Sequence, residues 1–235
     1  KKAAAAIAVA GSLATLGVFQ MNAESTELYE VDATTESEFQ AYTAKHGKSY
    51  GTKAEYNFRL EQFLKKDAEI NEINSENGTS QVGHNMFSDW TADEYKQLLG
   101  FKKIEPLMDK RFKTLDTSNL ADGVNWVTKG AVTPVKNQGQ CGSCWSFSTT
   151  GSMEGAHFIK TGKLVSLSEQ NLVDCSWLNM GCNGGMMDRA FGYAESHPLE
   201  TEADYPYVAK TGLFACKYDK SKGVVDVTTY TDVPH

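Results

Sequence analysis

The chain has 235 residues, of which 40% are hydrophobic, and a formal net charge of -7. This length fits one domain with a regulatory segment, and the apolar fraction is that of a globular protein. An acidic chain lacks the basic surface with which proteins bind nucleic acid, so we expect no nucleic-acid partner.

The N-terminal segment has the charge and hydropathy of a secretory signal peptide. Lys1 and Lys2 precede a nearly uninterrupted apolar run over residues 3–19, which is the order of the n-region and h-region of such a signal. The run is short for a membrane span, and the alternatives are an alanine-rich N-terminal helix or a signal anchor. We favour a cleaved signal over residues 1–23 and expect no stable membrane association.

Residues 24–119 contain no cysteine and are rich in helix formers, whereas glycine, cysteine and aromatic residues mark residues 120–235. The Asp, Thr, Ser and Asn residues of segment 116–121 predict a loop at the boundary. Within the first region, six residues recur at steps of three and four, as on one face of a long helix: Glu55, Arg59, Phe63, Lys66, Ile70 and Asn74. This periodicity alone is equally typical of any small helical bundle.

A second motif follows the predicted long helix, and it consists of Gly83, Asn85, Phe87 and Asp89. Residues 91–94 then form a capping box, which predicts a short helix that ends at Gly100. Together the two motifs resemble the ERFNIN and G-x-N-x-F-x-D motifs of cathepsin L-type propeptides, with Lys66 where an asparagine is usual. The resemblance implies that residues 24–119 are an inhibitory propeptide which lies in the active-site cleft of its own protein.

Residues 138–145 read QGQCGSCW, which includes the local signature of a papain-type nucleophile. A helix is predicted from Trp145 to a stop near Gly162, so Cys144 would lie at a helix N-terminus. The macrodipole and the unpaired N–H groups there favour the thiolate, which is the attacking species. The Gln138 amide and the Cys144 backbone N–H form a candidate oxyanion hole. The competing interpretations are a structural disulfide for Cys144 and a plain loop position for Gln138.

Five cysteines make an odd number, so a secretory chain would keep one as a free thiol or use it to bind another chain. The sequence alone leaves every choice of free cysteine and every pairing of the other four open. The resemblance to papain-like enzymes implies two disulfides, Cys141–Cys182 and Cys175–Cys216. Cys144 is then the free thiol.

Two further stretches, LSEQNLVDC at 167–175 and GCNGGMMD at 181–188, extend the resemblance to cathepsin L-type enzymes. It implies that the substrate is bound by Trp145, Gly184, Gly185 and Met187. Glycines without side chains would let an extended peptide pair with the backbone, and Met187 would line an apolar pocket. The competing interpretations are a plain turn for the glycines and core packing for Met187.

A cysteine protease needs an imidazole to move the proton and an asparagine to orient that imidazole. In the papain family these residues follow the cysteine by about 130–150 positions. The last residue here lies 91 positions after Cys144, and none of the five histidines is in the family's context: His46, His84, His157, His197 and His235. We therefore expect a fragment that is inactive by itself and stops before a β-rich domain.

The expected fold class is α+β, with a helical propeptide, the mainly helical N-terminal half of the papain-like fold, and a missing β-rich half. The expected full-length protein is a monomeric cysteine endopeptidase zymogen of the secretory pathway, lysosomal, vacuolar or extracellular. It would hydrolyse peptides or proteins without a metal or cofactor, and acid would trigger its maturation by protonating carboxylates such as Asp89. The alternative is a propeptide-type inhibitor or pseudo-protease in which Cys144 is a relic.

Overall fold

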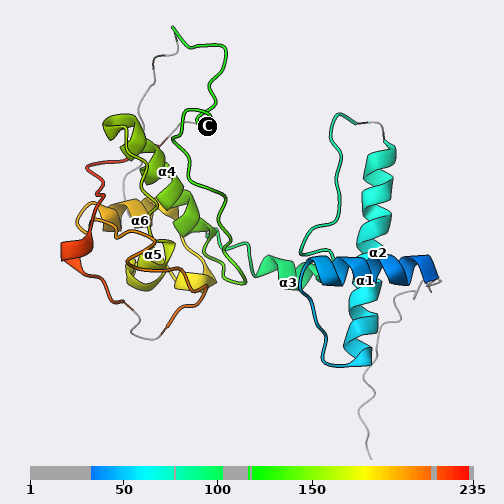
Figure 1. Cartoon of the computed structure of the whole chain (residues 1–235). Helices are drawn as coiled ribbons and strands as arrows, with labels where there is room; N and C mark the ends of the chain where they lie inside the picture. Colours follow the sequence, from blue (N-terminus) through cyan, green and yellow to red (C-terminus); the bar gives the residue numbers. More distant parts are fainter. Residues whose placement is uncertain (1–32, 77, 103–115, 117, 213–215, 233–235) are drawn as a thin grey trace, which may run out of the picture. The chain divides into compact units, whose positions relative to one another are not determined.

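The computed structural model describes residues 33–76, 78–102, 116, 118–212 and 216–232. The predicted signal peptide, part of the predicted 116–121 boundary and His235 lie outside this set. The chain divides into two compact units, Lys1–Gln81 and Val82–His235 (Figure 1). The second sequence motif therefore belongs to the same unit as the cysteine-rich region, while the domain boundary near residue 119 stays a prediction.

The first unit is built on helices α1 (Ala33–Lys45) and α2 (Lys53–Ser75). Aromatic rings fill the space between them, with 4.9 Å between the ring centroids of Tyr42 and Phe63 and 5.3 Å between those of Phe39 and Phe63. Burial of this cluster orients α2, because large aromatic side chains dominate the energy of a small core. The predicted long helix is confirmed, and Phe63 is its inward-facing motif residue.

The other motif residues of α2 lie nearer the solvent. Arg59 Nε lies 4.0 Å from Glu55 Oε1, one helical turn away, which is the spacing expected for an i, i+4 pair. Ile70 is half-buried and Asn74 is exposed. The Thr52 hydroxyl accepts a hydrogen bond from the Glu55 backbone N–H at 3.1 Å and so caps the start of α2.

The second motif forms a tight turn at the start of the second unit. The Asn85 side-chain oxygen accepts the Phe87 backbone N–H at 2.9 Å, and the Asn85 N–H donates to Ser88 Oγ at 3.0 Å. Asp89 is buried, whereas Gly83 is exposed. The motif therefore shapes the backbone just before the next helix.

Helix α3 (Ala92–Lys96) opens with the predicted capping box, in which Thr91 and Glu94 exchange hydrogen bonds. The predicted end at Gly100 is wrong, because α3 ends at Lys96. Gly100 is needed for a different reason: a Cβ atom there would lie 1.7 Å from the Gly142 carbonyl oxygen. The missing side chain lets the two backbone segments approach closely.

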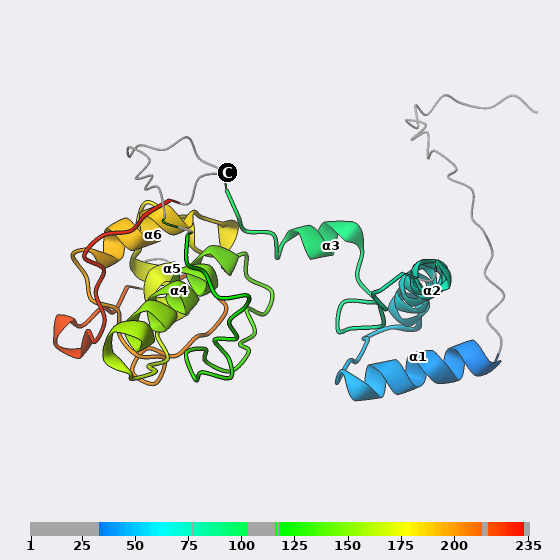
Figure 2. The same ribbon diagram turned by 90° about the horizontal axis from the view of Figure 1, so that it is seen from above.

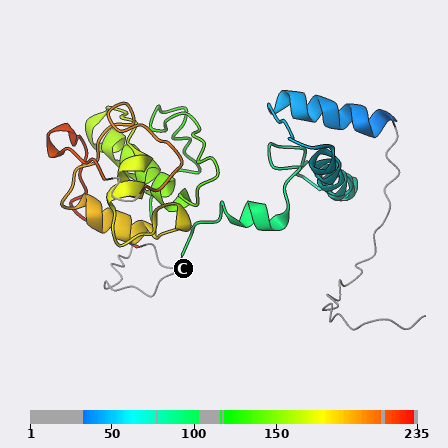
Figure 3. The ribbon, with the colours of Figure 1, turned by 90° about the horizontal axis from the view of Figure 1, so that it is seen from below.

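The regular structure in the rest of the second unit is also helical. It contains α4 (Cys144–Thr161), α5 (Glu169–Cys175), η1 (Gly181–Asn183), α6 (Met187–Ala194) and η2 (Lys220–Lys222). Helices α5 and α6 both pack against α4, as Figures 2 and 3 show from opposite sides. The core between them is formed by Trp145, Met153, Leu167, Leu172, Val173, Ala190, Ala194, Leu199 and Val225.

Within the described residues, β-pairing is limited to isolated bridges such as that between Leu199 and Val225. The regular structure of the described residues is thus helical, as expected for both regions of the chain. No helix in the described part of the chain has the length and apolarity needed to cross a membrane.

Helix α4 begins and ends where the sequence predicts. Its last turn is closed by Gly162, which has a φ of 73° and donates its N–H to the Phe158 carbonyl at 2.8 Å. Glycine suits this position because the left-handed conformation has no steric cost without a Cβ atom.

A buried ionic cluster joins three segments of the second unit. Lys136 Nζ lies 3.1 Å from Glu154 on α4 and 2.7 Å from Glu169 on α5. Both carboxylates are almost fully buried, with 2% and 1% of their surface exposed. Burial lowers the pKa of the Lys136 ammonium, but the two carboxylates outweigh this effect and leave its pKa above the ordinary value. The cluster thus fixes the segment before Cys144 against both helices.

We expect Lys136→Met to destabilise the second unit by about 3–5 kcal/mol, because removing the cation leaves two buried carboxylates without compensation. Urea denaturation followed by circular dichroism measures this change. The matched control is Lys163→Met, which removes an exposed lysine and should change the free energy of unfolding by less than about 0.5 kcal/mol. Equal stabilities of the two variants would contradict the assigned role of the cluster.

Candidate active site

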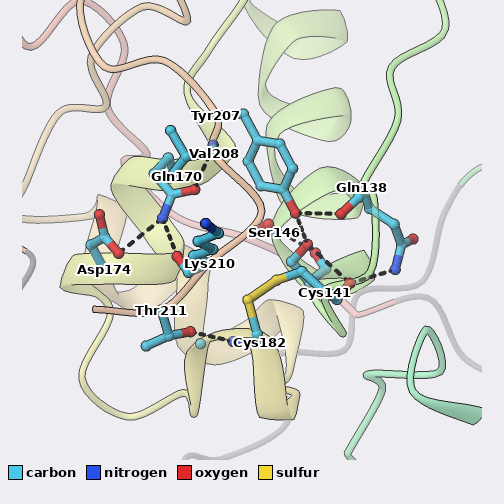
Figure 4. Close-up of a disulfide and its surroundings, with 12 residues drawn as sticks. Gln138, Cys141, Ser146, Gln170, Asp174, Cys182, Tyr207, Val208, Lys210 and Thr211 are labelled. Carbon is cyan, nitrogen blue, oxygen red and sulfur yellow. Dashed lines mark hydrogen bonds between the residues drawn. A yellow bond between two sulfur atoms is a disulfide. The ribbon is translucent and has the colours of Figure 1, made fainter. Parts of the chain in front are cut away.

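The loop that leads into α4 is anchored to η1. A disulfide joins Cys141 to Cys182, and the Gly142 N–H donates to the Cys182 carbonyl at 2.9 Å (Figure 4). A second disulfide joins Cys175 at the end of α5 to Cys216. These are the two pairs that the family resemblance implies, and Cys144 carries the free thiol.

Cys144 is the first residue of α4 and is half-buried. The next residue, Trp145, is fully buried and donates its indole N–H to the Gly181 carbonyl at 3.1 Å. This hydrogen bond fixes the first turn of the helix against η1. The thiol therefore lies at the N-terminus of a helix whose first turn is fixed in place.

The Gln138 amide is fully engaged near the start of α4. Its Nε2 atom donates to the Cys141 carbonyl at 2.8 Å and to the Leu98 carbonyl at 3.0 Å. The first hydrogen bond fixes the side chain within its own loop. In the second, this amide donates to the peptide carbonyl of a separate segment, which is the interaction expected of an oxyanion-hole donor.

The paired glycines after η1 hydrogen-bond an extended stretch of the same chain. The Gly185 N–H donates to the Gly100 carbonyl at 2.8 Å, and the Gly185 carbonyl accepts the Lys102 N–H at 3.0 Å. Phe101 and Gly185 thereby form a parallel β-bridge. Side chains would block this approach, since a Cβ atom on Gly184 would lie 2.5 Å from the Gly100 carbonyl oxygen. These backbones are thus suited to strand-like pairing with a peptide.

The other two predicted substrate contacts contribute to packing. Trp145 lies directly against Gly185, where a Cβ atom would come within 2.8 Å of the indole. Met187 is the first residue of α6, is half-buried and packs against the hydrophobic core. This contact matches the competing interpretation of Met187 as a core residue, and direct substrate contact by either side chain stays a prediction.

Tyr207 and Ser143 were not anticipated from the sequence. The Tyr207 hydroxyl donates to the Gln138 carbonyl at 2.8 Å (Figure 4) and lies 2.6 Å from Ser143 Oγ. Tyr207 is more than 60 positions from both partners, and no periodicity or motif connects them. The YPY triplet at 205–207 is a local feature of the sequence, but it does not predict which residues Tyr207 contacts.

The carboxyl groups of Glu202 and Glu169 interact with each other, and Glu202 also contacts Tyr207. The Glu202 side chain accepts the Tyr207 backbone N–H at 2.9 Å through Oε1, while Glu202 Oε2 and Glu169 Oε2 are buried without a donor among the described residues. Burial raises the pKa of Glu202, and the neighbouring charge and hydrogen bond of Glu169 raise it further. A protonated Glu202 carboxyl group would donate a hydrogen bond to the Glu169 carboxylate, and this bond would give both Glu202 Oε2 and Glu169 Oε2 a partner.

Cys144 makes no hydrogen bond with a described histidine. His157 follows it by 13 positions along α4, a distance of about 20 Å at the rise of an α-helix. The His197 ring stacks on Tyr193 at 4.5 Å. The described residues also contain no group of three or more His, Cys, Asp or Glu side chains that could hold a metal ion.

Comparison with known proteins accounts for this arrangement. Residues 120–235 match the family described as Papain family cysteine protease, and residues 39–95 match the Cathepsin propeptide inhibitor domain. The chain belongs to the papain family of cysteine proteases. Its two matched regions, in this order, are those of a cathepsin L-type precursor.

Individual relatives are similar to this papain-family chain over most of its length. The chain is 44% identical to Cysteine proteinase 15A of Pisum sativum, over 84% of its own length and 58% of the relative's. It is 43% identical to Procathepsin L of Mus musculus, over 86% and 62%. A solved procathepsin L 3 from the Tenebrio molitor larval midgut superposes with a TM-score of 0.76 at 35% identity, covering 86% of this chain and 67% of that one. The chain thus spans about six tenths of the curated relatives' length.

We expect Glu202→Gln to flatten the pH dependence of stability. The folded-state pKa of Glu202 lies above its ordinary value of 4.5, so the stability contributed by the proton is full below that value and is lost as pH rises through the folded-state pKa. Glutamine stays neutral at every pH and removes this loss. Urea denaturation from about pH 4 to about pH 7 measures the slope.

The matched control is Asp226→Asn, which neutralises an exposed carboxylate of the same unit. It should leave the slope as it is in the unsubstituted chain. A Glu202→Gln curve parallel to that of the unsubstituted chain would refute the shared proton.

We expect Gly100→Ala to release segment 98–102 from Gln138 and Gly185, because the new Cβ atom would collide with the Gly142 backbone. Iodoacetamide should then alkylate Cys144 about tenfold faster. This factor corresponds to a free energy of local opening that is lower by about 1.4 kcal/mol. Gly123→Ala, which places its methyl group in open space, is the control. An unchanged alkylation rate in Gly100→Ala would show that the segment does not cover the thiol.

Proposed function

We propose that the chain carries the propeptide and the nucleophile-bearing half of a latent cysteine endopeptidase. The observation that supports this most is the free thiol of Cys144 at the start of α4, in a loop where Gln138 and Gly185 already bind an extended peptide segment. The substrates would be peptides or proteins. We also propose the secretory pathway as its location, since Procathepsin L of Mus musculus is among the relatives and residues 1–19 have the charge and hydropathy of a signal peptide.

In the proposed reaction the Cys144 thiolate attacks the carbonyl carbon of a peptide bond. The electron pair of the carbonyl moves onto its oxygen, which the Gln138 amide and the Cys144 backbone N–H stabilise as an oxyanion. Collapse of this intermediate expels the amine, which must receive a proton, and leaves an acyl-enzyme. Water then releases the second product and restores the thiol.

Proton transfer in these steps needs an imidazole. Because no described histidine is hydrogen-bonded to Cys144, we propose that the 235 residues alone do not hydrolyse peptides. The imidazole would be supplied by a part of the protein other than the described residues. The present chain would then supply the nucleophile but not the general base.

Latency follows from the contacts of segment 98–102. Its Leu98 carbonyl occupies the Gln138 amide, and its Gly100 and Lys102 backbones occupy Gly185. A substrate would need the same hydrogen-bonding groups, so the segment would compete directly with substrate. We propose that the propeptide inhibits its own peptidase region in this way.

The decisive test is hydrolysis of a fluorogenic peptide by the longest natural chain after removal of the propeptide. We expect Cys144→Ser to reduce kcat by at least about 10⁴-fold, as loss of a covalent nucleophile does. Ser148→Ala, an exposed position on the same helix, is the control and should retain activity. Activity that survives Cys144→Ser would contradict the proposal.

The same experiment separates the alternative of an inhibitor or pseudo-protease. That function is favoured if the longest natural chain hydrolyses nothing while the 235-residue chain still inhibits a separate papain-family enzyme. The match of residues 39–95 to an inhibitor domain is the observation that keeps this alternative under test.

A further inference from the structure

The loop between α5 and η1 buries a polar side chain and exposes apolar ones. Trp177, Leu178 and Met180 are exposed, whereas Asn179 is buried, with 8% of its surface exposed. Burial of a carboxamide costs free energy unless its hydrogen bonds are satisfied. The position of Asn179 therefore depends on specific partners.

Both ends of the Asn179 carboxamide are hydrogen-bonded. Its Oδ1 atom accepts the Met186 backbone N–H at 2.8 Å, and its Nδ2 atom donates to Ser176 Oγ at 3.0 Å. The Met186 N–H can only donate, so it determines which end of the carboxamide is the oxygen. Ser176 is the C-cap residue of α5, and Met186 is the N-cap residue of α6. One side chain thus joins the end of α5 to the start of α6.

The hydrogen bond to Met186 orients the Gly185 carbonyl. The Met186 N–H and the Gly185 carbonyl belong to one peptide group, and in a planar trans peptide they point in opposite directions. Because Asn179 binds the N–H from one side, the carbonyl faces the other side, where it accepts the Lys102 N–H at 3.0 Å. Asn179 and Lys102 therefore hold opposite edges of the same peptide group.

The peptide group before Gly185 is held in the same way. The Met180 N–H donates to the Gly184 carbonyl at 2.9 Å, and the Gly185 N–H of that peptide group donates to the Gly100 carbonyl at 2.8 Å. The loop thus binds the inner edges of both peptide groups that flank Gly185, and an extended segment pairs with their outer edges. Met180 contributes a backbone N–H, which every residue except proline has, whereas Asn179 contributes its side chain.

The Asn179 carboxamide also packs directly against Gly185. A Cβ atom added to Gly185 would lie 2.6 Å from Asn179 Oδ1 and 2.8 Å from the Trp145 indole. Only glycine permits such a close approach. Packing as well as hydrogen bonding therefore couples the two residues.

We propose that Asn179 is a positioning residue that presents the N–H and the carbonyl of Gly185 to an extended peptide substrate. It acts through the peptide group shared by Gly185 and Met186. This inference rests on the proposed function, in which Gly185 binds substrate. Segment 98–102, which pairs with Gly185 in the chain itself, occupies the place of such a peptide.

The test is amide hydrogen exchange of the complete 235-residue chain, followed by NMR spectroscopy. Asn179→Ala removes the acceptor of the Met186 N–H, so the Gly185 carbonyl can turn away from its partner. We expect the Gly185 and Lys102 amides, neither of which is hydrogen-bonded to Asn179, to exchange about tenfold faster, the effect of losing one hydrogen bond. Amides in the middle of α4 should keep their rates.

Two further variants serve as controls. Asn183→Ala makes the same change at an exposed position in η1 and should leave both rates unchanged. Asn179→Asp keeps an oxygen for the Met186 N–H and should keep both rates at those of the unsubstituted chain. Unchanged rates in Asn179→Ala, or equal acceleration in Asn179→Ala and Asn179→Asp, would overturn the inference. An acceleration that includes the α4 amides would also overturn it, because it would report loss of the whole fold.

Ser176→Ala is a milder variant for the case in which Asn179→Ala does not fold. It removes the oxygen that holds Asn179 Nδ2 at 3.0 Å and leaves the carboxamide in place. The Gly185 and Lys102 amides should then exchange about threefold faster, since Asn179 loses one of its two hydrogen bonds. Rates equal to those of the unsubstituted chain would refute the positioning role.

The consequence for a substrate is measured on the longest natural chain after removal of the propeptide. A peptide bound to Gly185 makes these hydrogen bonds both before and during the reaction, so Asn179→Ala should raise KM about tenfold and leave kcat unchanged. An unchanged KM would overturn the inference. Absence of hydrolysis by the unsubstituted chain would refute the proposed function, while selective acceleration of exchange would still show that Asn179 positions Gly185.

Discussion

The covalent and hydrogen-bonded junction between the start of α4 and η1 determines the rest of the site. The Cys141–Cys182 disulfide and the hydrogen bond from Gly142 to Cys182 hold the loop in one position. Cys144 follows this loop directly, so its position is fixed together with that of the loop. Gly100 also approaches Gly142 here, at a distance that only glycine permits. The positions of the thiol, its loop and segment 98–102 thus depend on one small area of packed backbone.

Two further interactions hold the loop before Cys144: the ion pairs of Lys136 and the hydrogen bond of Tyr207. Lys136 binds buried carboxylates of α4 and α5, and the Tyr207 hydroxyl binds the Gln138 carbonyl. A buried ionic cluster contributes little net stability, but losing one partner is costly, so it specifies one arrangement of the three segments. Such rigidity suits a site in which an oxyanion-hole donor must be in place before the reaction. The stored proton of Glu202 would add an acid-dependent contribution to the same assembly.

Most of the fold could be predicted from local sequence. The α4 boundaries follow from helix periodicity and Gly162, and the α3 start follows from its capping box. The end of α3 could not be predicted, because the role of Gly100 is set by contacts with Gly142, 42 positions later. Tyr207 was missed for the same reason. Local patterns report helix propensity, whereas close backbone approach and distant hydrogen bonds depend on tertiary packing.

The central claim is that the fold selects and activates one cysteine of five. The most direct measurement is limited alkylation with iodoacetamide at about pH 6, where an ordinary thiol is almost fully protonated, followed by peptide mapping. The account predicts that the label is on Cys144 alone, that both disulfides stay intact, and that the reaction is faster than that of free cysteine. Label on Cys141, Cys175, Cys182 or Cys216, or a rate no higher than that of free cysteine, would contradict it.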